Sequence, residues 1–424
     1  MLYKTISVVG LGYIGLPTAA MFASKGINVI GVDINAQAVK TINSGKIHII
    51  ENGLEKIVSD TVKNKFLKAD ISFHEADAFL VAVPTPFKKS KLNYSIPEPD
   101  LSYIKKASKE IAKVLKKGNL VILESTSPVG TTEKMINWMR EERSDLKFPD
   151  INTDSDFDIN IAYCPERVMP GNIIHELIEN DRVIGGITKD CSAAASYLYK
   201  KFVKGKCIET DARTAEMVKL TENASRDVSI AFANELSIIC EDLDINVWEL
   251  INLANRHPRV NILQPGPGVG GHCIAVDPWF IVNRSPNLAK LIKQARDIND
   301  GKPSWVIEKV KSTVLDVLQS NQDRGILDIK IACFGLAFKA DIDDLRESPA
   351  MEITSKLSEW HSDEIMIVEP NIKKLPQSLT NCRLVDSHEA ITKSDIIVLL
   401  VDHKEFFSID FSNKNLIDTK GIKK

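Results

Sequence analysis

The sequence lacks both a long hydrophobic run and a marked excess of charge of either sign. No stretch of about 20 consecutive apolar residues occurs, so no membrane-spanning helix is expected. The 54 Lys and Arg residues nearly balance the 57 Asp and Glu residues, for a net charge of −3. Because like charges do not gather in blocks, the sequence gives no case for binding nucleic acid or a membrane surface.

Cysteine is scarce and follows no pairing pattern. The seven cysteines are scattered without a CxxC pair, which is typical of a reducing compartment and not of a disulfide framework. The N-terminal segment also lacks the basic flank and the small-residue cleavage site of a signal peptide. These absences predict a cytoplasmic protein.

Strand-like segments lie towards both ends of the chain. The 424 residues are more than one hydrophobic core usually supports, so two or three domains are expected. Short β-branched runs alternate with helical patterns, which predicts parallel sheets with helical crossovers. The expected strands lie at 6–10, 28–33, 78–83, 120–126 and 158–166, and again at 328–335, 364–370 and 394–403.

The middle of the chain has a helical pattern. From about Asp211, small and apolar residues keep helical spacing for longer than in a typical globular helix, and weaker helical segments follow to about Val310. We therefore predict an α/β protein with two Rossmann-like parallel-sheet domains, at 1–200 and 311–424, joined by a helical central domain at 201–310 that contains a long helix. After about Phe407 the sequence supports no prediction.

A glycine-rich corner follows the first expected strand and precedes a helical stretch. It comprises Gly10, Gly12, Tyr13, Ile14 and Gly15. Such glycines let a pyrophosphate approach the N-terminus of the helix, where free N–H groups favour negative charge. Asp33 ends the second expected strand, where an acid binds a ribose 2′-hydroxyl and repels a 2′-phosphate. The pattern predicts an NAD site; the alternative is that the glycines only form a tight corner.

Pro84, Thr85 and Thr126 follow later strands, at the edge of the sheet where open α/β folds bind ligands. They are candidates for cofactor contact. Ordinary turn chemistry explains them equally well.

A second glycine-rich loop precedes a cysteine. Four glycines between 266 and 271, including Gly270, allow a backbone to approach a ligand closely, and Cys273 follows directly. Cys240 and Cys333 lie in apolar periodic runs, as buried structural cysteines do, whereas Cys273 follows a polar loop, as reactive thiols do. The alternative for Cys273 is a small apolar residue that closes the loop.

His272 precedes that cysteine and could act as a base or a metal ligand. Because no second cysteine or histidine lies nearby at metal-binding spacing, we expect no metal. A hydrogen bond within the loop is the simpler interpretation of this histidine.

Lys219 and Asn223 are four residues apart in the expected long helix and therefore share one face, with Glu222 and Arg226 on neighbouring directions. A lysine beside an amide can stabilise negative charge on an oxygen. The alternative for Lys219 is an ordinary solvated charge on a helix surface.

At these residues the chain resembles the UDP-glucose/GDP-mannose dehydrogenase family. The resemblance runs from Val8 to about Val401 and covers all three expected domains. It is carried by VVGLGYIGLP, VPTP, ESTSPVGTT, YCPERVMPG, AEMVKLTENASRDVSIAFANE, PGPGVGGHCIAVDPWF and GLAFKADIDDLRESP. Several long motifs in the same order make chance negligible.

The resemblance implies a four-electron oxidation of a UDP-sugar at C6 with NAD and without a metal, in a homodimer formed through the middle helices. It makes Cys273 the nucleophile, Lys219 and Asn223 the oxyanion partners, Asp277 a base acting through water, and Glu166 a helper in the acyl steps. Beside the residues already given, it assigns Arg346 to cofactor binding. The substrate-binding set is Arg167, Val168, Lys219, Asn223, Arg226, His257, Arg259, Gly270 and Lys339, with Arg259 reaching a neighbouring subunit's site.

The chain departs from the hexose-oxidising members of that family. They carry CFPKD at the nucleophile, whereas this chain has CIAVD and therefore Val276 in place of a lysine. CPERVMPG likewise replaces their CPEF-type pattern. Both changes are typical of the branch that acts on UDP-N-acetylhexosamines. Within that branch, the resemblance of CIAVDPWF and NASRDVSIAFANE implies UDP-N-acetyl-D-mannosamine as substrate, with UDP-N-acetyl-D-glucosamine as the alternative. Two other interpretations remain: a two-electron hydroxyacid-type dehydrogenase, and an NAD-sensing module without catalysis.

Overall fold

The structure, a computed structural model, describes residues 3–88, 96–151, 156–169, 171–271, 273–321, 323–361 and 363–423. The chain folds into two compact units, the first ending at Glu222 and the second beginning at Asn223. His272, proposed from the sequence as a base or a hydrogen-bonding residue, lies outside the described residues.

The first unit is built on an eight-stranded sheet with the order β3-β2-β1-β4-β5-β6-β7-β8. The strands are β1 (Thr5–Val9), β2 (Asn28–Val32), β3 (Leu67–Asp70), β4 (Ala78–Val81), β5 (Leu120–Leu123), β6 (Asn160–Tyr163), β7 (Arg182–Gly186) and β8 (Cys207–Asp211). All neighbouring pairs are parallel except β6 and β7. The first six strands therefore have the order of a dinucleotide-binding fold.

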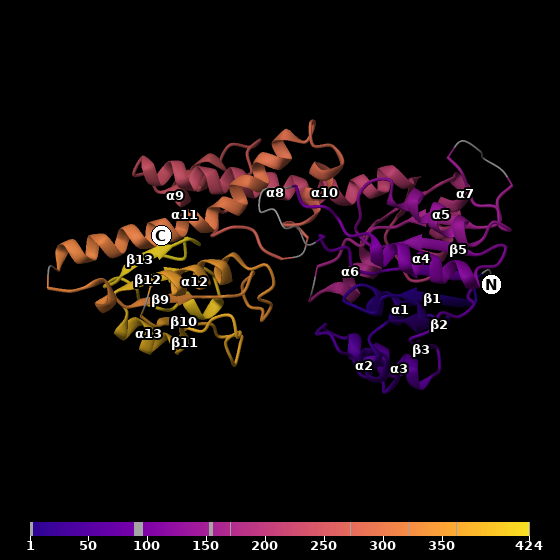
Figure 1. Ribbon diagram of the computed structural model, residues 1–424, viewed down its shortest axis with the longest axis horizontal. Helices are drawn as coiled ribbons and strands as arrows, with labels where there is room; N and C mark the ends of the chain where they lie inside the picture. Colours follow the sequence, from indigo (N-terminus) through magenta and orange to yellow (C-terminus); the bar gives the residue numbers. More distant parts are fainter. Residues whose placement is uncertain are drawn as a thin grey trace. The chain divides into compact units, whose positions relative to one another are not determined.

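Helices cover both faces of this sheet (Figure 1). They are α1 (Gly15–Ser24), α2 (Ala36–Asn43), α3 (Leu54–Lys63), α4 (Ser102–Val114), α5 (Thr131–Glu142), α6 (Ile173–Glu179) and α7 (Lys189–Tyr199). One core contains apolar side chains of α1, α2, α3, α6 and α7, and the other contains those of α4 and α5. Buried strands such as β4 and β5 are apolar on both faces for this reason.

The helix α8 (Ala212–Asp242) spans 31 residues. It begins directly after β8, and its first turn contributes Ala212 and Ala215 to the core beneath α4 and α5. The long helix predicted from about Asp211 is therefore present at the expected position.

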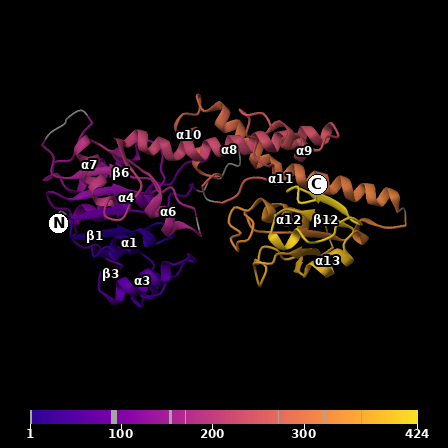
Figure 2. The ribbon, with the colours of Figure 1, turned by 180° about the vertical axis from the view of Figure 1, so that it is seen from behind.

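The second unit contains a five-stranded parallel sheet with the order β11-β10-β9-β12-β13. Its elements are α9 (Val247–Ala254), α10 (Asp277–Arg284), α11 (Lys290–Ser320), η1 (Ile326–Asp328), β9 (Ile331–Phe334), α12 (Pro349–Trp360), β10 (Ile365–Val368), β11 (Cys382–Leu384), α13 (Ser387–Lys393), β12 (Ile396–Leu399), η2 (Lys404–Phe406) and β13 (Asn415–Asp418). The helices α11 and α12 lie side by side on one face of the sheet (Figure 2), and α13 with η2 covers the other face.

The predicted fold class is confirmed: two Rossmann-like sheets with a helical segment containing a long helix between them in the chain. Two details differ from the expectation. The large sheet is mixed at β6–β7, and the last of the weak helical segments expected up to Val310 belongs to a single 31-residue helix, α11, which continues through Pro303. The boundaries at residues 200 and 310 stay predictions. No helix within the described ranges is both long enough and apolar enough to cross a bilayer.

Candidate active site

The corner between β1 and α1 depends on glycine at two positions and is open at a third. A Cβ at Gly10, where φ is +90°, would lie 2.6 Å from the Ala82 oxygen, and one at Gly15 would lie 1.8 Å from the Gly10 oxygen. A Cβ at Gly12 would meet no described atom within 4 Å. Gly10 and Gly15 are thus needed to form the corner, while Gly12 leaves room for the close approach of a pyrophosphate to the N-terminus of α1.

Asp33 lies at the end of β2 and is hydrogen-bonded to this corner. Its Oδ2 accepts from the Leu11 N–H at 2.8 Å, and its Oδ1 accepts from the Asn35 N–H at 2.8 Å. Each carboxylate oxygen can accept a further hydrogen bond. The side chain is therefore fixed beside the corner and retains acceptor capacity for ribose hydroxyls, so the residues present fit NAD.

The loops after β4 and β5 are joined through two of the predicted cofactor residues. The Thr85 hydroxyl donates to the Thr126 carbonyl oxygen at 2.6 Å, and the Ser125 hydroxyl donates to the Val83 oxygen at 2.7 Å. Pro84, between Val83 and Thr85 in the chain, is exposed. The structure brings Thr85 and Thr126 together, and their contact with a cofactor stays a prediction.

The loop after β6 carries three predicted residues, Glu166, Arg167 and Val168. The Glu166 side chain is buried, and its Oε1 accepts from the Arg167 N–H at 2.6 Å. The Arg167 guanidinium forms an ion pair with Glu222 of α8 (Nη2–Oε1, 2.5 Å), and Val168 packs against the core. The loop is thus tied to the first half of α8, beside a hollow of about 190 Å³ that all three residues line.

Glu216 fixes the first turns of α8 to the N-terminus of α5. Its buried carboxylate accepts hydrogen bonds from the Gly130 N–H at 2.6 Å, the Thr132 N–H at 2.8 Å and the Thr132 hydroxyl at 2.7 Å. Burial raises the pKa of Glu216, and these donors oppose the shift. Lys219, which is half-buried, follows one turn later. Sequence reasoning missed Glu216, although an acid among the apolar positions flanking Lys219 was a visible signal.

Asn223 and Asp277 form a buried pair in the second unit. The Asn223 Nδ2 donates to Asp277 Oδ2 at 2.5 Å, and Asp277 is the first residue of α10. Its N–H donates to the Cys273 carbonyl oxygen at 2.9 Å, so Cys273 lies in the turn that leads into this helix. Three of the predicted catalytic residues are therefore joined by hydrogen bonds or by one turn of backbone.

Cys273 is exposed, whereas Cys240 and Cys333 are buried. This is the difference in accessibility that the sequence pattern predicted. The role of Cys273 as nucleophile stays a prediction.

The glycines before Cys273 allow close packing within the second unit. A Cβ at Gly270 would lie 2.5 Å from the Glu347 oxygen, and one at Gly268 would lie 3.0 Å from Pro349 Cβ. The sequence predicted that these glycines let a ligand approach the backbone. In the structure, the missing side chain of Gly270 makes room for the loop before α12. The loop is also held by Asn234 of α8, whose Oδ1 accepts from the Gly266 N–H at 2.9 Å.

Lys339 lines a second hollow, of about 310 Å³, at the carboxyl end of the second sheet. Lys420 from the C-terminal segment lies on the same hollow and pairs with Asp402 at 3.1 Å. Gly268 of the glycine-rich loop and Phe338 also line this hollow. Two lysines in one hollow suit a diphosphate. Sequence reasoning missed Lys420, because the segment after Phe407 carried no recognised motif.

The other predicted binding residues of the second unit are exposed. His257 and Arg259 lie on a loop after α9 that is closed by the Asn255 side chain, which donates to the Ile262 oxygen at 2.9 Å. Arg226 is exposed on α8. Arg346, predicted to bind the cofactor, donates through Nε to Asp344 Oδ1 at 2.8 Å.

The corner after β9 repeats the geometry of the corner after β1. Gly335 has φ +93°, and the N–H of Leu336 donates to Glu369 Oε2 at 2.7 Å, as the Leu11 N–H does to Asp33. His403 fills the position beside this acid, with its Nε2 3.0 Å from Glu369 Oε2. Burial would raise the pKa of Glu369, but the hydrogen bonds from His403 and Leu336 hold it below its usual value.

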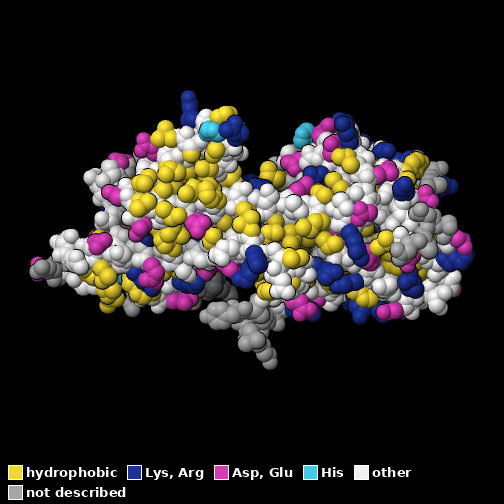
Figure 3. Space-filling model, turned by 90° about the horizontal axis from the view of Figure 1, so that it is seen from above, with side chains coloured by type: hydrophobic (Ala, Val, Ile, Leu, Met, Phe, Trp, Pro, Cys, Tyr) yellow, Lys and Arg dark blue, Asp and Glu magenta, His cyan; other side chains and the backbone are white. Residues whose placement is uncertain are grey.

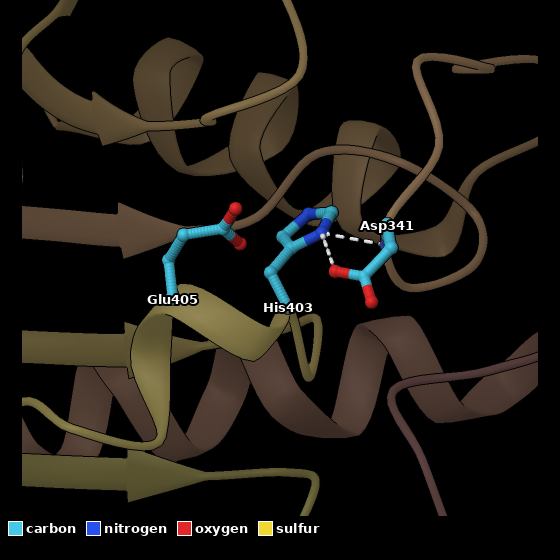
Figure 4. A group of neighbouring side chains, drawn as sticks. All are labelled: Asp341, His403 and Glu405. Carbon is cyan, nitrogen blue, oxygen red and sulfur yellow. Dashed lines mark hydrogen bonds and ion pairs between the residues drawn. The ribbon is translucent and has the colours of Figure 1, made fainter.

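Asp341, His403 and Glu405 are close enough together to resemble a metal-binding group (Figure 4). The imidazole is not available as a ligand, however. Its Nδ1 accepts from the Asp341 N–H at 2.9 Å, and its Nε2 faces Glu369. Both ring nitrogens are therefore engaged within the protein, and this cluster does not make a metal site.

A glycine corner closed by an acid, in a sheet of this strand order, defines a dinucleotide-binding α/β protein. The second unit adds a similar sheet, in which the corresponding acid, Glu369, is already bonded to His403. The exposed thiol of Cys273 lies on the segment that precedes this sheet in the chain. These features define the class as a dinucleotide-dependent enzyme with a separate binding surface for its substrate.

The chain belongs to the UDP-glucose/GDP-mannose dehydrogenase family. Residues 4–203 match the family's NAD binding domain, residues 213–301 its central domain and residues 332–424 its UDP binding domain. The family predicted from the motifs is confirmed, as are NAD as cofactor and NAD-dependent dehydrogenase as the class of enzyme.

The chain is similar over its full length to enzymes named for N-acetylhexosamine derivatives. It is 60% identical to the UDP-N-acetyl-D-mannosamine dehydrogenase of Escherichia coli (strain K12), over 100% of both chains. It is 55% identical to the NDP-N-acetyl-D-galactosaminuronic acid dehydrogenase of Ralstonia nicotianae, over 99% of this chain and 96% of that protein. The solved structure of a UDP-N-acetyl-mannosamine dehydrogenase from S. aureus has 41% identity and a TM-score of 0.83, covering 99% of this chain and 95% of that one.

Proposed function

We propose that the protein oxidises UDP-N-acetyl-D-mannosamine at C6 to UDP-N-acetyl-D-mannosaminuronate, with two NAD per turnover. The observation that carries this proposal is the exposed Cys273 in the turn before α10, beside the hydrogen-bonded pair of Asn223 and Asp277. The 60% identity to the E. coli enzyme supports the choice of sugar. UDP-N-acetyl-D-glucosamine is the alternative, and the Ralstonia relative adds the galactosamine series as a further candidate.

Gly12 and Asp33 would hold NAD at this corner, and two NAD bound in succession would each take one hydride from C6. In the first oxidation, the C6 hydroxyl proton leaves through water to Asp277, which Asn223 holds in place. The Cys273 thiolate then adds to the aldehyde carbon, and Lys219 and Asn223 stabilise the oxyanion of the thiohemiacetal. After the second oxidation the sugar is a thioester on Cys273, and water releases the acid with help from Glu166.

A panel of UDP-sugars tests the proposal. NADH formed per sugar consumed is measured with UDP-N-acetylmannosamine, UDP-N-acetylglucosamine, UDP-N-acetylgalactosamine and UDP-glucose. Two equivalents of NADH with the first sugar are expected. One equivalent would support a two-electron dehydrogenase instead, and no NADH with any sugar would support an NAD-sensing module.

Cys273→Ser tests the covalent step. We expect this variant to bind NAD with unchanged affinity and to form no acid, because an alcohol at this position is a poor nucleophile at neutral pH. Cys240→Ser, at a buried cysteine, is the matched control. Normal acid formation by Cys273→Ser would contradict the thioester mechanism.

We propose that the protein acts as a homodimer formed through the middle helices. Hydrophobic side chains gather over the C-terminal half of α8 and over α9 (Figure 3). The exposed members there are Phe232, Ile239, Leu243, Ile245 and Leu253. A surface of this kind is typical of a subunit interface. Phe232→Glu should shift the mass measured by light scattering to that of a monomer, whereas Ile71→Glu, at an exposed isoleucine of the first unit, should not.

We further propose that Arg259 completes the site of the partner subunit. The exposed loop that carries Arg259 supports this role. Arg259→Ala and Cys273→Ala, each inactive alone, should regain about a quarter of wild-type activity when mixed under conditions of subunit exchange, since half of the dimers then hold one complete site. No recovery in mixtures shown to contain mixed dimers would place Arg259 in its own subunit's site.

The remaining organisation follows the family. We propose functional domains at 1–200, 201–310 and 311–424, supported by the order of the matched segments. The absence of a disulfide among the seven cysteines, all of which lie in the described residues, supports action in the cytoplasm.

A further inference from the structure

A buried polar cluster lies behind Glu166 in the first unit. It contains Arg182 of β7, Glu124 after β5, Tyr199 of α7 and Cys164 after β6. Arg182 is 4% exposed, Glu124 1% and Tyr199 0%. Buried charges are costly unless they are paired, so such a cluster calls for a physical reason. The proposed mechanism uses Glu166 but none of these four residues.

Arg182 contacts the carboxylate oxygen of Glu166 that the loop backbone does not bind. Its Nη2 lies 3.5 Å from Glu166 Oε2, while Glu166 Oε1 accepts from the Arg167 N–H at 2.6 Å. The guanidinium itself is held in place by rings, with its Cζ 4.9 Å from the centroid of Tyr199 and 5.9 Å from that of Phe202. The carboxylate of Glu166 is therefore contacted at both oxygens, by a backbone N–H at Oε1 and by the guanidinium of Arg182 at Oε2.

A second buried carboxylate, that of Glu124, is bonded to the Tyr199 side chain on which Arg182 packs. Glu124 Oε1 accepts from the Tyr199 hydroxyl at 2.5 Å, and Glu124 Oε2 has no hydrogen-bond partner among the described residues. Burial raises the pKa of Glu124 to about 7, which Glu166 favours and which Arg182 and Tyr199 oppose. Burial also raises the pKa of Cys164 to about 12 and that of Tyr199 well above its usual value. Arg182 thus pairs with Glu166 and acts electrostatically on Glu124, whose pKa is raised to about 7.

We propose that Arg182 is the positioning residue of Glu166, and that Glu124 and Tyr199 set how fully Arg182 engages it. Glu124 stands two residues before Thr126, on the loop expected to contact the cofactor. The cluster therefore links that loop to the loop that carries Glu166. This inference rests on the proposed function, because it concerns the last step of the proposed reaction.

In that step, water adds to the thioester carbonyl and its proton passes to the Glu166 carboxylate. The carbon–sulfur bond then breaks, and Cys273 leaves as a thiolate. The rate depends on the direction in which the Glu166 oxygens point, since small misplacements of a reacting group cost large factors in rate. Neither earlier hydride transfer needs Glu166 in this orientation.

Arg182→Lys tests the positioning role. Lysine keeps the charge but lacks the planar fork that spans Glu166 and the Tyr199 ring. In rapid mixing we expect a burst of two NADH per Cys273 at the wild-type rate, followed by acid release slowed roughly 10- to 100-fold. Arg143→Lys is the matched control, because Arg143 also holds a carboxylate in this unit, that of Asp145. Equal slowing of burst and acid release would overturn the proposal.

A double-mutant cycle separates positioning from a general structural effect. If Arg182 acts through Glu166, the effect of Arg182→Lys on acid release should vanish in the Glu166→Gln background. An undiminished effect there would contradict the proposal.

Glu124→Gln supplies a second test that leaves Arg182 in place. As pH rises through about 7, ionised Glu124 should draw Arg182 from Glu166 and slow acid release in the wild type. The ratio of variant to wild-type rates should therefore be near unity about one pH unit below this pKa and exceed unity about one unit above it. A ratio independent of pH would overturn the proposal. Failure of these tests in an enzyme that still yields two NADH per sugar would leave the proposed function intact.

Discussion

At the scale of the residue, one glycine-rich corner shows two separate uses of the missing side chain. Gly10 and Gly15 are packed so tightly that a Cβ would collide with backbone oxygens, while Gly12 faces open space. The sequence motif predicted the site but could not distinguish these roles, because the three glycines look alike in a string of letters. The distinction depends on where the Ala82 backbone lies, which only the fold supplies.

This difference predicts opposite effects for matched substitutions. Gly12→Ala should leave the fold intact and raise the dissociation constant of NAD roughly tenfold, because a methyl group then occupies the path of the pyrophosphate. Gly15→Ala should lower the free energy of unfolding by roughly 1 to 3 kcal/mol, as in an overpacked core. Thermal unfolding without NAD and NAD titration by calorimetry measure the two effects. Equal losses of stability in both variants would contradict the assignment.

Glu124 predicts a pH dependence of stability. Its pKa is raised from 4.5 to about 7 in the folded protein by burial, so the folded state binds more protons than the unfolded state between these values. Stability contributed by this group is present at low pH and is lost as pH rises from about 4.5 through about 7. Denaturant unfolding of Glu124→Gln should show a shallower fall of stability across this window, by an amount on the order of a few kcal/mol. If the unfolding free energies of the wild type and of Glu124→Gln changed with pH in parallel, the raised pKa of Glu124 would be refuted.

At this scale, the sequence predicted which cysteines are exposed or buried but did not predict contacts between residues far apart in the chain. The exposure of Cys273 and the burial of Cys240 and Cys333 could be predicted from neighbouring residues in the chain. The pairing of Glu124 with Tyr199 could not, because these residues are 75 positions apart and neither belongs to a pattern with the other.

At the scale of the element, predictions succeeded for strands with an uninterrupted apolar run and failed at sheet edges and at the interior strand β7 (RVIGG), whose two glycines shorten its apolar run. The central strands β1, β4, β5 and β9 are largely apolar and were found from that pattern. The strands β3 (LKAD), β8 (CIETD) and β11 (CRL) mix polar and apolar residues because they lie at sheet edges with less covering, and they were missed. Pro303 and Gly301 concealed the length of α11, whose packing against the second sheet outweighs two poor helix formers.

The joint between α5 and α8 provides an element-scale prediction. Glu216→Gln replaces an acceptor of three hydrogen bonds by a group that must turn one N–H₂ towards donors, so we expect a loss of roughly 2 to 4 kcal/mol in unfolding free energy. Glu133→Gln is the matched control, because Glu133 pairs with Arg213 and so joins the same two helices at the surface. It should cost under about 1 kcal/mol. If chemical denaturation showed similar losses of unfolding free energy for Glu216→Gln and Glu133→Gln, the role of Glu216 in joining α5 and α8 would be contradicted.

At the scale of the whole molecule, the proposed sites for the two nucleotides lie on separate sheets, in the segments that match the family's NAD binding and UDP binding domains. The first sheet offers Gly12 and Asp33 to a dinucleotide, and the second offers the hollow lined by Lys339 and Lys420. The family and its cofactor could be predicted from contiguous motifs. The contribution of Lys420 could not, because it depends on β13 bringing the C-terminal segment back to the second sheet.

This separation predicts independent losses of affinity. Lys420→Met and Lys339→Met should each raise the dissociation constant of UDP roughly tenfold by removing a cation from the hollow, and leave that of NAD unchanged. Lys374→Met, in a loop outside this hollow, is the control. Both ligands are titrated calorimetrically against each variant. A change in NAD affinity as large as the change in UDP affinity would contradict separate sites.

The hydrogen bonds that Glu369 already accepts affect the order of events in the proposed reaction. Donors from Leu336, Ala337, Asn371 and His403 already occupy its two oxygens, so the second sheet cannot offer a ribose the acid that the first sheet offers. Two successive oxidations then share one pocket, and used dinucleotide must be exchanged for fresh while the sugar is half oxidised. An aldehyde held by weak contacts would escape during that exchange, whereas a sugar bonded to sulfur stays until the replacement arrives.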